Sequence, residues 1–129
     1  MNRYSEIISE YLLRYKEGEI AEAWHGLVES GLDSTEGVSA IASAFDNESC
    51  LEAKSWLLSL LGQFRCDLAM DFLKHNLRRS EDVIWKIALD GLAEAAPHDL
   101  IERLEHVLFV TKEKTKAEWI EEVIRNARN

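Results

Sequence analysis

Among the residues of this sequence, two carboxylate–histidine couples most resemble a catalytic or metal-binding site. Asp71 precedes His75 by four positions, and Glu102 precedes His106 by four, 31 positions further along the chain. Residues four apart share one face of a helix, so each couple sets a carboxylate beside an imidazole. On adjacent helices these four side chains would be of the kind that binds a transition metal. The alternative, which we prefer, is that each couple is a simple pair on an exposed helix.

No catalytic motif accompanies the couples. The chain contains no GxSxG, Walker loop, HExxH or GxGxxG sequence. Cys50 and Cys66 stand sixteen positions apart without a CxxC or Cys/His framework. That spacing suggests neither a zinc site nor a disulfide, and we expect both cysteines to be reduced core residues. The sequence therefore predicts a protein that is not an enzyme and holds no metal and no cofactor.

The charge distribution is the most informative feature for function. A formal net charge of −9 argues against nucleic acid as a partner, because phosphate recognition needs a positive footprint. Between Lys16 and Lys54 there is no Lys or Arg, and acidic side chains there would attract a basic protein. The alternative is an acidic surface that only favours solubility. The residues expected to contact the partner are Glu19, Glu22, Glu29, Asp33, Glu36, Asp46, Glu48 and Glu52.

Trp85 is a further candidate contact residue. It lies off the apolar stripe of its own helical segment, so it would form an exposed anchor with Asp82 and Asp90 around it. A helix in the middle of a stack is buried on two sides, however, and Trp85 would then belong to the core. Both interpretations stay open at the level of sequence.

Helices must position these residues. Apolar side chains recur at helical spacing almost throughout, and one Pro and six Gly leave few signals for β-structure. We expect Ile20, Val28, Trp24, Trp56 and Trp119 to face inward, within one domain of residues 1–129. The expected helices are 2–16, 19–30, one from Asp33 or Ser34 to about Asp46, one capped at 47–49 and ending at 61, 66–77, one starting at 80–82 and ending before Pro97, 99–110, and one after 111–115.

The apolar pattern repeats. A shift of 31 positions pairs Ala53 with Ile84 and Leu61 with Leu92, and a shift of 32 pairs Trp56 with Trp24. The run SEDVIWKIALDGLAEAA resembles the second helix of a HEAT repeat. This resemblance implies an all-α fold of about eight short helices in antiparallel hairpins, stacked as a short HEAT-like α-solenoid. A closed bundle with incidental periodicity is the alternative.

Small acidic HEAT-like chains of this size are similar to bacterial immunity proteins. That similarity implies an inhibitor that neutralises a basic toxin domain, for example a nuclease, through its acidic surface, and that is monomeric when free. The alternative is an adaptor or scaffold that binds its partner in a concave groove of the even-numbered helices, centred on Trp85. No apolar run reaches the about 18 to 20 residues of a membrane span, and the first residues lack the order of a secretory signal, so we expect a cytoplasmic location and no membrane partner.

Overall fold

The computed structural model describes residues 3–30, 34–64 and 66–129, and in these ranges it is all-helical. Asn2 and Asp33, which the sequence placed at helix starts, lie outside the described residues. The eight helices are α1 (Arg3–Lys16), α2 (Ile20–Glu29), α3 (Thr35–Asn47), α4 (Leu51–Leu61), α5 (Asp67–Asn76), α6 (Asp82–Ala95), α7 (Leu100–Val110) and α8 (Lys114–Arg128). None of them combines the length and apolar character that crossing a bilayer requires.

Local chemistry explains where these helices begin and end. The Ser34 hydroxyl accepts a hydrogen bond from the Gly37 N–H at 3.1 Å and so caps the start of α3. Gly18 separates α1 from α2 with a φ of +94°, a conformation that glycine adopts without strain. Ala96 ends α6 in the left-handed region, directly before Pro97.

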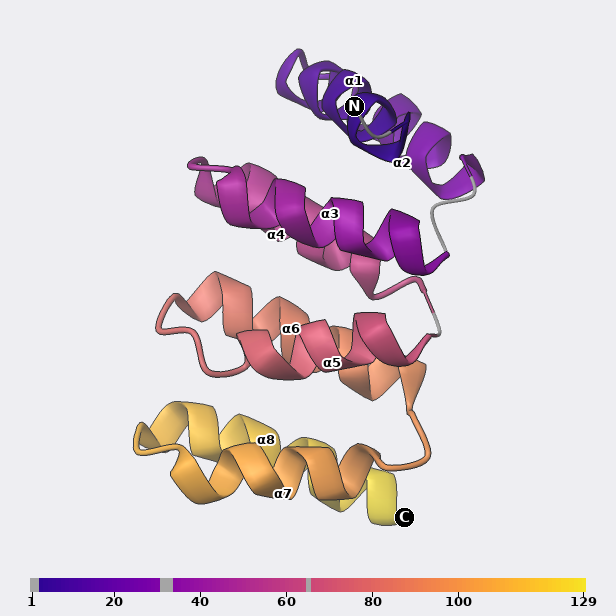
Figure 1. The fold of residues 1–129 in the computed structure, drawn as a ribbon. Coiled ribbons are helices and arrows are strands. Elements are labelled where there is room, and N and C mark those ends of the chain that lie inside the picture. Colours follow the sequence, from indigo (N-terminus) through magenta and orange to yellow (C-terminus); the bar gives the residue numbers. More distant parts are fainter. Residues whose placement is uncertain (1–2, 31–33, 65) are drawn as a thin grey trace.

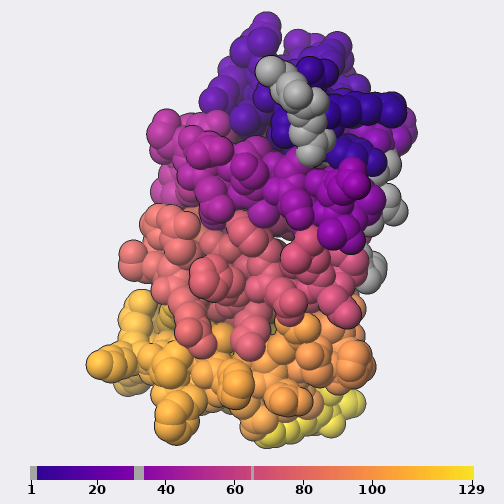
Figure 2. All heavy atoms as spheres, in the orientation of Figure 1, coloured from indigo at the N-terminus to yellow at the C-terminus, as the bar shows by residue number. Residues whose placement is uncertain are grey.

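Consecutive helices pair, and the pairs lie in four layers that follow the sequence (Figure 1). Within the stack α1, α3, α5 and α7 contact one another in order, and α4, α6 and α8 form a parallel row. The space-filling view shows the layers as successive bands of one elongated molecule (Figure 2). The core runs through all four layers, and α4, in the middle, buries more residues than any other described helix.

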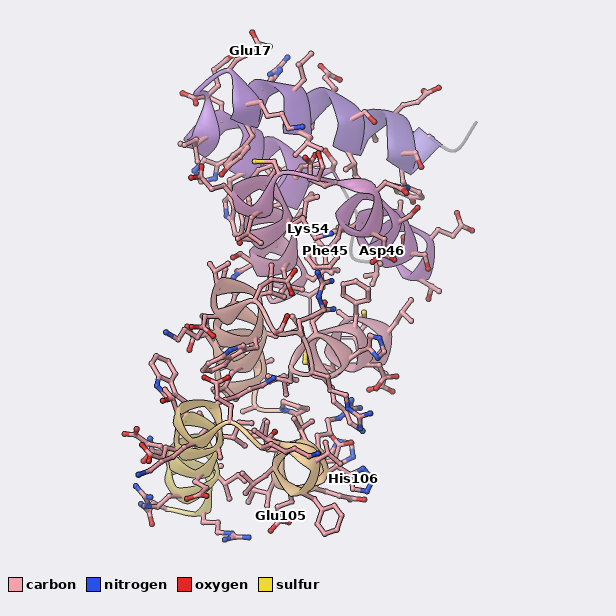
Figure 3. All side chains as sticks on the ribbon, turned by 90° about the vertical axis from the view of Figure 1, so that its left-hand side faces the viewer. Glu17, Phe45, Asp46, Lys54, Glu105 and His106 are labelled. Carbon is pink, nitrogen blue, oxygen red and sulfur yellow. The ribbon has the colours of Figure 1, made fainter. Side chains whose placement is uncertain are left out.

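The first layer is turned relative to the others. Viewed from the side, α1 with Glu17 at its end runs across the picture, whereas the lower helices are seen nearly along their axes (Figure 3). α2 packs mainly on α1, through Ala23 and Leu27, which are fully buried. Ile20 and Val28 were expected to face inward too, but this is wrong: they are 53% and 41% exposed, because α2 lacks a neighbouring layer on that side.

Two further expectations about the core are wrong. Trp119 is 41% exposed, because α8 belongs to the last layer and its indole is covered chiefly by Trp85, edge to face at 5.8 Å. Cys50 is exposed and Cys66 is half-buried, because they are the residues that precede α4 and α5 rather than members of an inward face. Both thiols are free.

Candidate functional site

Most of the predicted acidic contact residues are exposed, but they do not form one compact cluster. α3 carries Glu36 and Asp46 at its two ends, on the row of odd-numbered helices. The others lie at the start of α2 or on the row of even-numbered helices. The exposed members of this second group are Glu19, Glu22, Glu29, Glu52, Asp82 and Asp90.

Glu48 differs from the other predicted contacts, and its assignment as part of an open acidic surface is wrong. Its side chain is 7% exposed, accepts a hydrogen bond from Lys16 Nζ at 2.9 Å and accepts another from the Cys50 N–H at 2.9 Å. Burial alone would raise the pKa of Glu48, but these hydrogen bonds and the Lys16 charge outweigh it and hold the pKa below its usual value. Glu48 therefore joins α1 to the start of α4.

Trp85 is not an exposed anchor. Its side chain is 1% exposed, and its indole Nε1–H donates to Asp82 Oδ1 at 3.0 Å. Lys86 Nζ and Lys116 Nζ lie 5.6 Å and 5.7 Å from the centre of the ring. Trp85 lies off the main apolar stripe of α6, but α8 packs on that side of α6 and encloses the indole. The alternative interpretation, in which this helix is buried on two sides, is confirmed.

The two lysines that border the acidic interval are both engaged within the protein. Lys16 is engaged by Glu48, as described above. Lys54 is buried, and its Nζ donates to the Phe45 carbonyl oxygen at 2.6 Å, between α3 and α4 (Figure 3). The exposed carboxylates of α2, α3 and α4 thus lack a neighbouring free cation from either end of this interval.

The carboxylate–histidine couples do not make a metal site. Asp71 accepts a hydrogen bond from Arg103 Nη1 at 2.5 Å, and the same guanidinium holds Asp99 through Nε at 2.8 Å. These ion pairs raise the pKa of Arg103 and so keep it charged. His75 and His106 are exposed. In the described ranges no group of three or more His, Cys, Asp or Glu side chains is placed to hold a metal ion.

A small hollow crosses the row of even-numbered helices and brings together residues that the sequence left apart. Its volume is about 160 Å³. It is lined by Trp24 from α2, by Leu58, Ser59, Gly62 and Gln63 at the end of α4, and by Ile87, Asp90, Gly91 and Glu94 from α6. We call this hollow with its borders the α2/α4/α6 groove. Of the predicted contacts, Asp90 alone lines it.

Sequence reasoning missed most of this groove. Trp24 was assigned to the core, yet it is only half-buried, with its ring edge to face with Trp56 at 6.3 Å. The available signal was Gly91, a glycine inside a helix, which often marks close approach of backbones. A Cβ on Gly91 would lie 3.5 Å from the Cα of Gly62, so α4 and α6 meet at these two glycines, and the surface above them is hollow.

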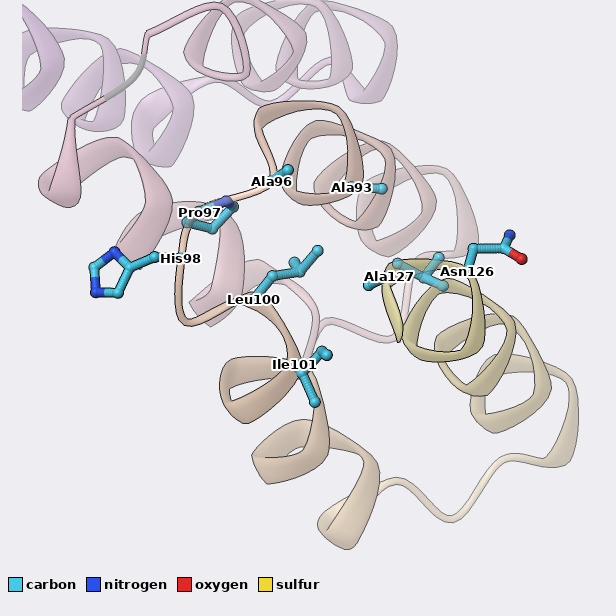
Figure 4. Close-up of a pocket in the computed structure, with 9 residues that line it drawn as sticks. Ala93, Ala96, Pro97, His98, Leu100, Ile101, Asn126 and Ala127 are labelled. Atoms are coloured by element: carbon cyan, nitrogen blue, oxygen red, sulfur yellow. The ribbon is translucent and has the colours of Figure 1, made fainter. Parts of the chain in front are cut away.

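A larger hollow of about 370 Å³ lies near the end of the stack, where α6, the turn at Pro97, α7 and α8 meet (Figure 4). Its lining is mainly small and apolar. The His98 and Asn126 side chains point away from the other lining residues (Figure 4). Without convergent polar groups it lacks what an active site needs for chemistry.

Comparison with known proteins adds no assignment: no family model matches the chain, and neither the curated proteins nor the solved structures gave a match.

Proposed function

We propose that this protein is a binding inhibitor of the immunity type. The four helix pairs are a short HEAT-like α-solenoid of antiparallel hairpins, and its acidic surface neutralises a basic toxin domain such as a nuclease. The protein acts by contact, without catalysis, in the cytoplasm. The observation that carries the proposal is the set of exposed carboxylates on α2, α3 and α4 whose bordering lysines, Lys16 and Lys54, are held in internal contacts.

Electrostatic steering is the physical effect through which these carboxylates would act on a partner. Exposed carboxylates on one protein add their fields, which speeds the approach of a cationic partner and orients it. The same field repels nucleic acid, so the protein would compete for a basic active site without binding its substrate. The adaptor alternative depended on Trp85 as an exposed anchor. Because that indole is buried, the inhibitor proposal is favoured.

The test begins with capture of partners from cell lysate at low and high salt, using the tagged protein and mass spectrometry. A partner of pI above about 9 that is released at high salt is then purified. Its affinity is measured for the protein and for a variant in which four exposed carboxylates are made neutral. The four substitutions are Glu22→Gln, Glu29→Gln, Glu36→Gln and Asp46→Asn.

The matched control neutralises Glu113, Glu118, Glu121 and Glu122, four exposed carboxylates at the start of α8 and along it. We expect the first variant to weaken binding by at least tenfold and the control by less than threefold, and we expect co-expression to suppress toxicity of the partner. Capture of acidic or neutral proteins alone, or equal affinity of the two variants, would overturn the proposal.

A further inference from the structure

The helix α2 carries an apolar stripe that the other described helices cover only in part. Ile20, Trp24 and Val28 are four residues apart and so lie along one side of the helix. Their neighbours Ala23 and Leu27 supply the buried contact with α1. α2 is thus apolar on two sides. The first packs on α1, whereas on the second Trp24 meets Trp56 of α4 and Ile20 and Val28 stay exposed.

The middle member of this stripe opens onto the α2/α4/α6 groove. Trp24, from α2, and Ile87, from α6, both line the hollow, and both are half-buried. A volume of about 160 Å³ corresponds to roughly five water molecules, below the range of about 300 to 1,000 Å³ typical of small-molecule pockets. The hollow therefore has room for one apolar side chain of a protein partner.

Two carboxylates border the same hollow. Asp90 and Glu94 are exposed on α6, one turn apart, and neither forms a hydrogen bond or ion pair with any part of the chain that the structure describes. The single basic residue of α6, Lys86, is directed elsewhere, with its Nζ 4.9 Å from the centre of the Trp119 ring. The border is negative and open to a cation from outside.

We propose that the α2/α4/α6 groove binds a basic amphipathic segment of the partner protein. One apolar side chain of this segment inserts between Trp24 and Ile87, and Lys or Arg side chains beside it pair with Asp90 and Glu94. A tryptophan at the edge of a small pocket is a common hot spot, and the paired charges fix the direction of the segment. This inference rests on the proposed function, because it assigns the region of the acidic surface that the basic partner contacts.

The probe is a fluorescently labelled 14-residue peptide of Leu and Lys with a helical apolar face, and its matched control has Glu in place of every Lys. Binding is followed by fluorescence anisotropy at two salt concentrations. The variants are Asp90→Lys with Glu94→Lys, and Trp24→Ala. The control variant, Glu118→Lys with Glu122→Lys, changes the net charge equally on exposed positions of α8.

We expect the Asp90/Glu94 reversal to weaken binding of the Lys peptide at least tenfold and to give measurable binding of the Glu peptide. The α8 reversal should weaken it less than threefold. Equal loss in the two reversals would overturn the proposal, because net charge alone would then explain binding. Both reversals lie on exposed positions, so they test the groove even if Trp24→Ala fails to fold.

The captured partner separates failure of this inference from failure of the proposed function. If a basic partner binds and is lost on neutralising the acids of α2 and α3, but tolerates the Asp90/Glu94 reversal, the groove inference is wrong and the inhibitor proposal stands. If no basic protein is captured while the Lys peptide still depends on Asp90 and Glu94, the groove binds basic segments and the inhibitor proposal is wrong.

Discussion

Lys54 Nζ lies 2.6 Å from the carbonyl oxygen of Phe45 and 4.2 Å from the centre of the same residue's ring. The ammonium group thus donates a hydrogen bond to a carbonyl oxygen in the last turn of α3, and the Lys54 side chain is buried. Lys54 therefore links α4 to the end of α3 as a structural residue.

Substitution of Lys54 by Ala should destabilise the protein. The change removes a charge-assisted hydrogen bond and the packing of a buried stem, and we expect a loss of about 2 kcal/mol in the free energy of unfolding. Urea denaturation followed by circular dichroism measures it. Lys112→Ala, at an exposed position, is the control and should change stability by less than about 0.5 kcal/mol. Equal effects in the two variants would contradict the structural role of Lys54.

The Lys16–Glu48 pair predicts a pH dependence of stability. Because the pKa of Glu48 is lower in the folded protein than its unperturbed value of 4.5, the carboxylate contributes stability above that pH, and the contribution is lost as pH falls through the folded pKa. Glu48→Gln should therefore cost about 1 kcal/mol at pH 7 and progressively less below about pH 4. Denaturant titrations of both proteins at pH 7, 5, 4 and 3 test this. If the two proteins differed in free energy of unfolding by the same amount at every pH, the ionised form of Glu48 would not be the source of the stability.

Close approach of Leu73, on α5, makes Gly91 sensitive to size. A Cβ there would lie 3.1 Å from Leu73 Cδ1, and Leu73 is fully buried. Overpacking costs about 1 to 3 kcal/mol, of which the better helix propensity of Ala recovers about 1. Gly91→Ala should thus lower the free energy of unfolding by about 1 kcal/mol, whereas Ser39→Ala, exposed in α3, should be nearly neutral. A stabilised Gly91→Ala protein would show that the Leu73 side chain can shift at little cost.

Trp85 should matter for stability and not for binding. Trp85→Phe keeps most of the buried ring but loses the donor to Asp82, so we expect a loss of about 1 to 2 kcal/mol in the free energy of unfolding. Affinity for the basic peptide, measured well below the unfolding temperature, should change less than twofold. A large loss of affinity at unchanged stability would restore Trp85 as a contact residue.

The candidate groove shows where sequence reasoning fails. Asp90 was predicted as a contact because it would lie beside an exposed Trp85, and it lines the groove although Trp85 is buried. Trp24 and Val28 were placed inside because apolar residues at helical spacing indicate a buried face, but α2 has two such faces and only the one with Ala23 and Leu27 is fully covered. Periodicity tells which residues share a face. It does not tell which face has a neighbour.

The sequence by itself determined the helices, since the period of apolar residues, the cap at Ser34 and the breaks at Gly18 and Pro97 act within a few residues of the chain. Only the tertiary structure decided which charges are free. Glu48 forms an ion pair with Lys16, and Asp71 forms one with Arg103, each 32 positions away. Asp90 forms none in the described part of the chain. Ion pairs between layers depend on how the helix pairs turn against one another, and that turn results from packing of the whole stack, which no local spacing encodes.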